Sequence, residues 1–125
     1  MNEGISPPLA VYYGGCTVTV NYSTIYVNRP FAVLEIRPDV VSVRFRLRVI
    51  AAVSSIRRGV HLERNDIVSV NSVRVSSWLS YAGIEFQLTE GQPAYFWVDP
   101  APVLAIMATL DYSVDSTEKL IRRPF

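Results

Sequence analysis

The fold of this chain is decided by residues 41–49, which read VSVRFRLRV and alternate apolar and polar residues without a break. Successive side chains of a β-strand point to opposite faces, so this alternation places all the apolar residues on one face. The other face carries Ser42, Arg44, Arg46 and Arg48. The pattern therefore predicts a half-buried strand with a row of arginines on its outer side.

Composition favours a single folded domain over residues 1–125. The chain is 50% hydrophobic and 18% charged, which argues against widespread disorder. Its formal net charge of +1 is too close to neutral for a general nucleic-acid binder, so any anion site must be a local patch. Nearly all the positive charge is arginine, which suits bidentate contacts to carboxylates or phosphates.

The cellular setting follows from cysteine usage and from the lack of long apolar segments. Cys16 is the only cysteine, so no internal disulfide forms and a cytosolic setting is allowed. The first 15 residues contain Glu3 and two prolines, which is not the pattern of a secretory signal. No apolar run approaches the ~18 residues that a membrane helix needs. We expect a soluble cytoplasmic protein that is not transmembrane.

The first half of the chain reads as strands and tight turns. Residues 1–8 are predicted to form a flexible arm because a glycine and two prolines disfavour regular structure. Residues 9–13 predict a short strand, which Gly14 and Gly15 should end. Two antiparallel hairpins are expected next: residues 17–20 with 23–27, and residues 31–36 with 40–50 around a turn at 37–39.

The second half continues with strands and then changes period. Strands are predicted at residues 56–62, 67–75, 84–88 and 94–98, and a slip in the apolar pattern after Val70 predicts a bulge near Asn71. Asp99 is a good N-cap and Pro100 suits a first helical position. Val103, Ile106, Met107 and Leu110 then follow helical spacing, so a buried helix is expected over about residues 100–110.

The C-terminal tail, residues 113–125, carries a second capping pattern. Asp115 is followed three residues later by Glu118, before Leu120 and Ile121. This spacing predicts a short terminal helix as one option for the tail.

Three segments together resemble a known family: residues 65–70 (NDIVSV), 83–86 (GIEF) and 97–100 (WVDP), the last leading into the helix. Over residues 23–112 the chain resembles the pleckstrin-homology-like (PH-like) superfold, especially small bacterial PH and GRAM-like domains. The resemblance implies a mainly β domain over residues 9–112. It would be a partly open barrel of about seven antiparallel strands in two packed sheets, with the helix plugging one end.

The resemblance also bears on ligand binding. Phosphoinositide-binding PH domains carry a basic residue late in the first strand and an Arg/Lys-x-Arg pattern in the second. Arg37 matches the former, and Arg44 with Arg46 matches the latter. The turn between them is shorter than the phosphate-cradling loop of those domains, and the helix lacks their common tryptophan. Many PH-like domains bind no lipid and dock on proteins instead, since a fold does not define a function.

Two groups of residues are candidates for binding. Arginines spaced along one strand face can span a lipid headgroup or successive phosphates, with Arg57 and Arg58 as further neighbours. The alternative is a solvated outer face on which Glu35, Glu63 or Glu85 pairs with the arginines. Aromatic residues in the N-terminal strands and in the connection at residues 76–81 indicate a partner surface, unless Trp78 folds back as a lid. The candidates for anion or lipid binding are Arg37, Arg44, Arg46 and Arg48, and those for partner binding are Tyr12, Tyr13, Trp78, Leu79 and Tyr81.

Enzymatic chemistry has little support in the sequence. His61 is the only histidine, so a His-rich metal site is excluded, and a pair of Cys16 with His61 is the one nucleophile arrangement available. No glycine-rich nucleotide-binding motif occurs, and we expect no metal and no cofactor. The sequence predicts a non-enzymatic binding or scaffolding module for a protein partner or self-assembly into a homo-oligomer. The alternative is peripheral binding of anionic lipid headgroups, and nucleic-acid binding ranks third.

Overall fold

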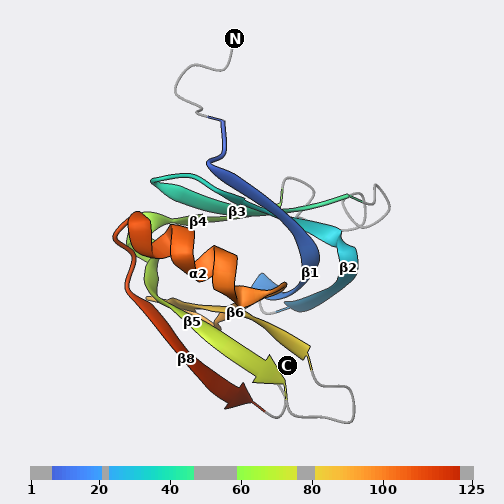
Figure 1. The fold of residues 1–125 in the computed structure, drawn as a ribbon. Helices are drawn as coiled ribbons and strands as arrows, with labels where there is room; N and C mark the ends of the chain where they lie inside the picture. The colour runs from blue at the N-terminus through green and yellow to red at the C-terminus, as the bar shows by residue number, and fades with distance from the viewer. Residues whose placement is uncertain (1–6, 21–22, 47–58, 76–80, 122–125) are drawn as a thin grey trace.

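A computed structural model describes residues 7–20, 23–46, 59–75 and 81–121, and the chain forms a sheet with the strand order β4-β3-β2-β1-β7-β6-β5-β8 (Figure 1). The elements are β1 (Ala10–Val20), β2 (Ser23–Ile36), β3 (Val40–Phe45), β4 (Val60–Glu63), the 3₁₀ turn η1 (Arg64–Asp66), β5 (Ile67–Val75), β6 (Tyr81–Leu88), β7 (Ala94–Trp97), the helix α2 (Pro100–Thr109) and β8 (Val114–Ile121). The expectation of a mainly β fold with one C-terminal helix is confirmed. The expectation of seven antiparallel strands is wrong, because an eighth strand, β8, joins the sheet parallel to β5.

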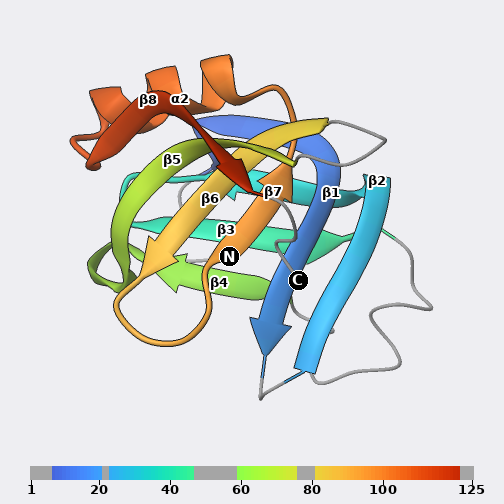
Figure 2. The ribbon, with the colours of Figure 1, turned by 90° about the horizontal axis from the view of Figure 1, so that it is seen from below.

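The sheet is strongly curled and remains open. β4, β3 and β2 make one layer, and β7, β6, β5 and β8 make the other. The long strand β1 joins the layers, because it pairs with β2 along its length and with β7 over residues 15–17. Figures 1 and 2 show β1 and β2 bending from one layer towards the other, with α2 lying across the open side.

The two predicted hairpins are present. β1 and β2 pair from the hairpin end, where Val20 lies opposite Ser23. β2 and β3 pair from Ala32 to Ile36, and a 2.9 Å bond from the Arg37 N–H to the Val40 carbonyl closes their turn. The part of the arginine-bearing strand predicted beyond residue 46 lies outside the described residues, as do residues 1–6 of the predicted arm.

Gly14 and Gly15 do not end β1, so this prediction is wrong. A Cβ atom on Gly14 would lie 2.2 Å from the Trp97 carbonyl oxygen, and one on Gly15 would lie 2.6 Å from the Val27 carbonyl oxygen. The glycines instead let the backbone of β1 come close to β7 on one side and β2 on the other. They mark the place where the two layers meet.

β2 compensates for this close approach with a bulge over residues 28–31. Two steps along β1, from Gly14 to Cys16, match five steps along β2, from Ala32 to Val27. Four residues of β2, 28–31, therefore lie opposite the single residue Gly15 of β1, so β2 carries three extra residues. Regular alternation would place Val27 and Ala32, five residues apart, on opposite faces; the bulge interrupts the alternation, and both residues face the core.

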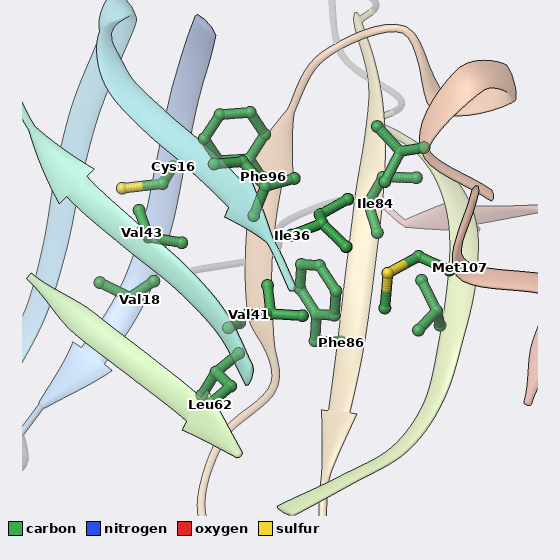
Figure 3. Close-up of a cluster of buried hydrophobic side chains, with 14 of the residues drawn as sticks. Cys16, Val18, Ile36, Val41, Val43, Leu62, Ile84, Phe86, Phe96 and Met107 are labelled. Atoms are coloured by element: carbon green, nitrogen blue, oxygen red, sulfur yellow. The ribbon is translucent and has the colours of Figure 1, made fainter. Parts of the chain in front are cut away.

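The core fills the space between the layers and α2. Figure 3 shows Val41, Val43 and Leu62 on one side facing Phe86, Ile84 and Met107 on the other. Phe86 and Phe96 are the largest of its fully buried side chains. At roughly 25 cal/mol for each Å² of apolar surface removed from water, this burial is the main stabilisation of the fold.

The slip in the apolar pattern of β5 has a different cause from the one predicted. From Ser69 to Val75 the strand pairs with β6 in unbroken register, so no bulge occurs on β5 near Asn71. Val70 faces the main core, whereas Val73 and Val75 face a second cluster on the outer side of the sheet. β5 is thus buried on one face near Val70 and on the opposite face at Val73 and Val75. This change of buried face explains why the apolar residues of β5 do not follow a single alternating pattern.

The helix follows its predicted pattern. Its N-cap, Asp99, accepts a 3.3 Å hydrogen bond from the Ala101 N–H, and Pro100 is the first helical residue. Val103, Leu104 and Met107 are buried in the core, with Ile106 and Leu110 packed at its margin. No helix in the described ranges has the length and hydropathy required to span a bilayer.

The short terminal helix considered for residues 113–125 is not formed at Val114–Ile121, which is strand β8. The Asp115 carboxylate does accept a hydrogen bond from the Thr117 N–H, at 2.9 Å, but this closes a local turn and does not start a helix. Here two steps along β5 match four along β8, so the turn is a bulge at the sheet edge. Beyond the bulge, Lys119 reaches Glu85 and Ile121 packs on the second cluster, which holds β8 in the sheet.

Candidate binding surface

Arg44 and Arg37 lie on the outer face of the first layer and share one carboxylate. The Arg44 Nε is 2.9 Å from one oxygen of Glu35, and a terminal nitrogen of Arg37 is 3.4 Å from the other. Burial opposes ionisation of Glu35, but the two guanidinium groups outweigh it and lower its pKa below the ordinary value. One glutamate thus neutralises one of the two arginines, and half of the Arg44 side chain stays exposed.

Arg46 lies on the same face beside an exposed aromatic ring. Its guanidinium carbon is 5.1 Å from the centre of the Tyr13 ring, within the range of a cation–π contact, and it also donates to the Pro30 carbonyl at 3.4 Å. Tyr13 is 55% exposed, and Val11 and Phe31 beside it are also exposed. We call this group the β1–β3 surface: Val11, Tyr13, Phe31, Glu35, Arg37, Arg44 and Arg46.

The remaining predicted residues fall in three places. Tyr12 points inward, where it packs against the core and its hydroxyl is 3.5 Å from the Pro102 carbonyl, so it is no part of this surface. Tyr81 lies in the other layer, on the second cluster. Arg48, Trp78 and Leu79 lie outside the described residues, as do Arg57 and Arg58.

Of the three glutamates considered as partners for the arginine row, Glu35 pairs with Arg37 and Arg44 in the part of the chain that the structure describes. Glu85 is held by Lys119 and by neighbouring side chains of its own layer. Glu63 caps the 3₁₀ turn η1: its side chain accepts from the Asp66 backbone N–H, and its own backbone N–H donates to the Asp66 carboxylate at 3.3 Å. Glu35 therefore balances part of the positive charge of the arginines on this face.

The candidate nucleophile pair does not assemble. Cys16 is buried in the main core, where desolvation raises its pKa to about 12 despite a hydrogen bond to the Val27 backbone. His61 points to the outer face of the sheet, and its Nδ1 lies 2.9 Å from the Ser42 hydroxyl. The two groups are separated by the sheet, so Cys16 has neither a base nor an accessible thiolate.

A second polar and aromatic cluster was not anticipated from the sequence. On the outer face of β5–β8, Tyr95 stacks on Trp97 with ring centres 5.4 Å apart, and Tyr81 meets Trp97 edge-on at 4.9 Å. The buried Glu85 carboxylate accepts from the Tyr95 hydroxyl at 2.9 Å and from Lys119 at 3.2 Å. The residues of this cluster alternate along β6 and β7, so the sequence shows that they share one face of each strand. The sequence does not show whether that face is the inner or the outer face of the sheet.

Within the described ranges, His, Cys, Asp and Glu side chains form no group of three that could hold a metal ion. Comparison of the chain with protein-family models, with curated proteins and with solved structures returned no match.

Proposed function

We propose that this chain is a non-enzymatic binding module that docks on a protein partner through the β1–β3 surface. The observation that carries the proposal is the contact between Arg46 and Tyr13 beside Arg44, because it places exposed aromatic and arginine side chains together. Tyrosine and arginine are enriched among the residues that dominate the energy of protein interfaces.

The charge of this surface favours an acidic partner. The residues that define this surface include three arginines and one glutamate, Glu35, a formal sum of +2 for this set. Symmetric pairing of the surface with a second copy would bring like charges together, which opposes that form of self-association. Arg44 donates to Glu35 through Nε, so its terminal N–H groups can reach a carboxylate of the partner.

A PH-like architecture is part of the same proposal. Two meanders, β1–β4 and β5–β7, are followed by a helix across the open side of the sheet, and this order of elements supports the resemblance. The parallel strand β8 is an addition to that plan. The PH-like resemblance is compatible with protein docking and with lipid binding, so the test must separate the two.

A peptide selection tests protein docking. We expect a random displayed-peptide library, selected against the full chain, to enrich peptides that carry Asp or Glu beside an apolar residue. Arg44→Gln together with Arg46→Gln should weaken their binding by about tenfold or more, since a hydrogen bond to a charged group contributes roughly 1.5–3 kcal/mol. Tyr13→Ser should weaken it as well, because the exposed ring is lost.

The matched control is Arg74→Gln. Arg74 is a partly exposed arginine in the other layer, where it pairs with Glu118 at 3.1 Å. Peptide binding should be unchanged in this variant. Enriched peptides that bind the Arg44/Arg46 variant as tightly as the wild type would contradict docking at the β1–β3 surface.

Peripheral binding to an anionic membrane is the second candidate function. Exposed Val11, Tyr13 and Phe31 beside cations also suit insertion at a lipid headgroup boundary. In this case the wild type should co-sediment with phosphatidylserine-containing vesicles but not with neutral ones. The Arg44/Arg46 variant should lose about 30-fold in affinity, since each of the two cations contributes roughly 1 kcal/mol near an anionic surface. Equal sedimentation with both vesicle types, or none, would reject this candidate.

A further inference from the structure

A second concave site lies on the outer face of the sheet and shares no residue with the β1–β3 surface. It is an open cavity of about 380 Å³ between the bulge of β2 and the aromatic residues of β6 and β7. This volume falls in the range of small-molecule sites, roughly 300–1,000 Å³. Its floor is the backbone around Gly15 with Thr17, and its walls are Tyr26, Asn28 and Arg29 on one side and Tyr81 and Trp97 on the other.

The wall on the β6–β7 side is held in place by several contacts. Trp97 stacks on Tyr95 on one side and meets Tyr81 edge-on, and its Nε1–H donates to the Thr17 hydroxyl at 3.0 Å. A Cβ atom on Gly83 would lie 2.6 Å from the Trp97 ring, so the ring also rests directly on the backbone of β6. A wall fixed in this way loses little side-chain entropy when a planar ligand packs against it.

The wall on the β2 side supplies charge and hydrogen-bonding groups. Residues 28–31 form the bulge that β1 leaves unpaired, which places Asn28 and Arg29 at the cavity beside the exposed ring of Tyr26. No carboxylate among the described residues lines the cavity, and none of them forms an ion pair with Arg29. The site therefore combines aromatic walls with one positive charge that is not balanced locally.

We propose that this cavity binds a planar aromatic ring that carries an anionic group, a carboxylate or a phosphate. The ring packs between Tyr26 and the Tyr81–Trp97 wall, the anion pairs with Arg29, and the Asn28 amide completes the polar contacts. Aromatic stacking and a charge-assisted arginine contact together suit this class of ligand. The cavity shares no lining residue with the β1–β3 surface, so the proposal does not depend on the proposed docking function.

Titration of the ¹⁵N-labelled full chain with phenyl phosphate tests the proposal by nuclear magnetic resonance. The expected result is a saturable shift of the Gly15 and Thr17 amide signals and of the Trp97 indole N–H signal, which Trp78→Phe assigns. Arg29→Gln should weaken this binding by about tenfold, the loss of one charge-assisted contact. Tyr26→Ser should weaken it by about fivefold, the loss of one stacking ring. The matched control, Arg74→Gln, should bind phenyl phosphate as the wild type does.

Two further ligands, adenosine monophosphate and benzoate, distinguish a nucleotide from an aromatic acid as the natural ligand. Tighter binding of adenosine monophosphate than of benzoate would assign a nucleotide, and the reverse order would assign an aromatic acid; both outcomes support the proposal. The proposal is overturned if none of the three ligands gives saturable shifts at Gly15, Thr17 and Trp97. It is also overturned if inorganic phosphate binds as tightly as phenyl phosphate, or if neither variant weakens binding.

Discussion

Replacing Gly14 with alanine is expected to lower the free energy of unfolding by about 3 kcal/mol, at the upper end of the cost of overpacking a well-filled site. The added methyl group would lie 2.2 Å from the Trp97 carbonyl oxygen and 3.0 Å from the Phe96 ring. The first neighbour is backbone and the second is a completely buried side chain, so neither can move away easily. The clash falls where β1 pairs with β7 and joins the two layers.

Denaturant unfolding of the wild type and of Gly14→Ala, followed by circular dichroism, measures the difference in their free energies of unfolding. Gly91→Ala is the matched control, because a Cβ atom there meets nothing within 4 Å although the residue has a positive φ of 82°. That variant should lose only about 1 kcal/mol, the cost of a left-handed backbone for a residue with a side chain. A loss at Gly14 no larger than that at Gly91 would show that β1 and β7 are not in close contact.

Replacing Glu85 with alanine should also lower the free energy of unfolding by about 3 kcal/mol at pH 7. Its carboxylate is 1% exposed and accepts hydrogen bonds from Tyr95 and Gln87, both at 2.9 Å, and from Asn71 at 3.2 Å. Removing the acceptor leaves several donors in the protein without a partner, which costs more than the net value of the bonds themselves. It also frees Lys119, whose ion pair with Glu85 connects β8 to β6 across the intervening strand β5.

The effect of this substitution should depend on pH in a defined direction. Burial raises the pKa of Glu85, but the bonds from Gln87, Tyr95 and Lys119 outweigh it, and the net result is a pKa below the ordinary value of 4.5. The folded state therefore binds its proton less readily than the unfolded state. The stabilisation that this ionisation contributes is complete above about pH 4.5 and is lost as the pH falls through the lower, folded-state pKa.

Urea unfolding of wild type and Glu85→Ala between pH 7 and pH 3 tests both parts of the prediction. The difference in stability should be constant down to about pH 4.5 and should narrow below it. Glu118→Ala is the control, because Glu118 forms an exposed pair with Arg74 and its loss should cost at most about 1 kcal/mol. A difference at pH 7 as small as that of the control would contradict the buried network.

Local signals in the sequence predicted much of the fold. The hairpins depend on short turns between alternating segments, and the helix depends on Asp99, Pro100 and the spacing of Val103 and Met107. These interactions connect residues close together in the chain, so the sequence pattern contains them. Arg44 and Glu35, one of the three glutamates considered as its partner, lie on adjacent strands of one hairpin, so this pairing too is a local signal.

Long-range packing accounts for what the sequence did not reveal. Gly14 and Gly15 were predicted to end a strand. They instead allow close contact with the backbone of Trp97, which is distant in the chain, and of Val27, which lies across the bulge, and a local pattern contains neither contact. A short helix was considered for the tail because Asp115 and Glu118 have the spacing of a helix cap. The contact from Lys119 to Glu85, which holds this segment in the sheet, joins residues 34 positions apart and is therefore not visible in a local pattern. The cavity beside Trp97 combines β1, β2, β6 and β7, so no single segment predicts it.

Isothermal titration calorimetry of a selected acidic peptide is the most direct measurement of docking at the β1–β3 surface. The wild type, Arg44→Gln/Arg46→Gln and Arg74→Gln should be titrated at the same salt concentration, since exposed charges are screened. We expect the double variant to bind about tenfold or more weakly and Arg74→Gln to bind as the wild type does. Equal affinity of all three proteins would contradict the assignment of this surface as the docking site.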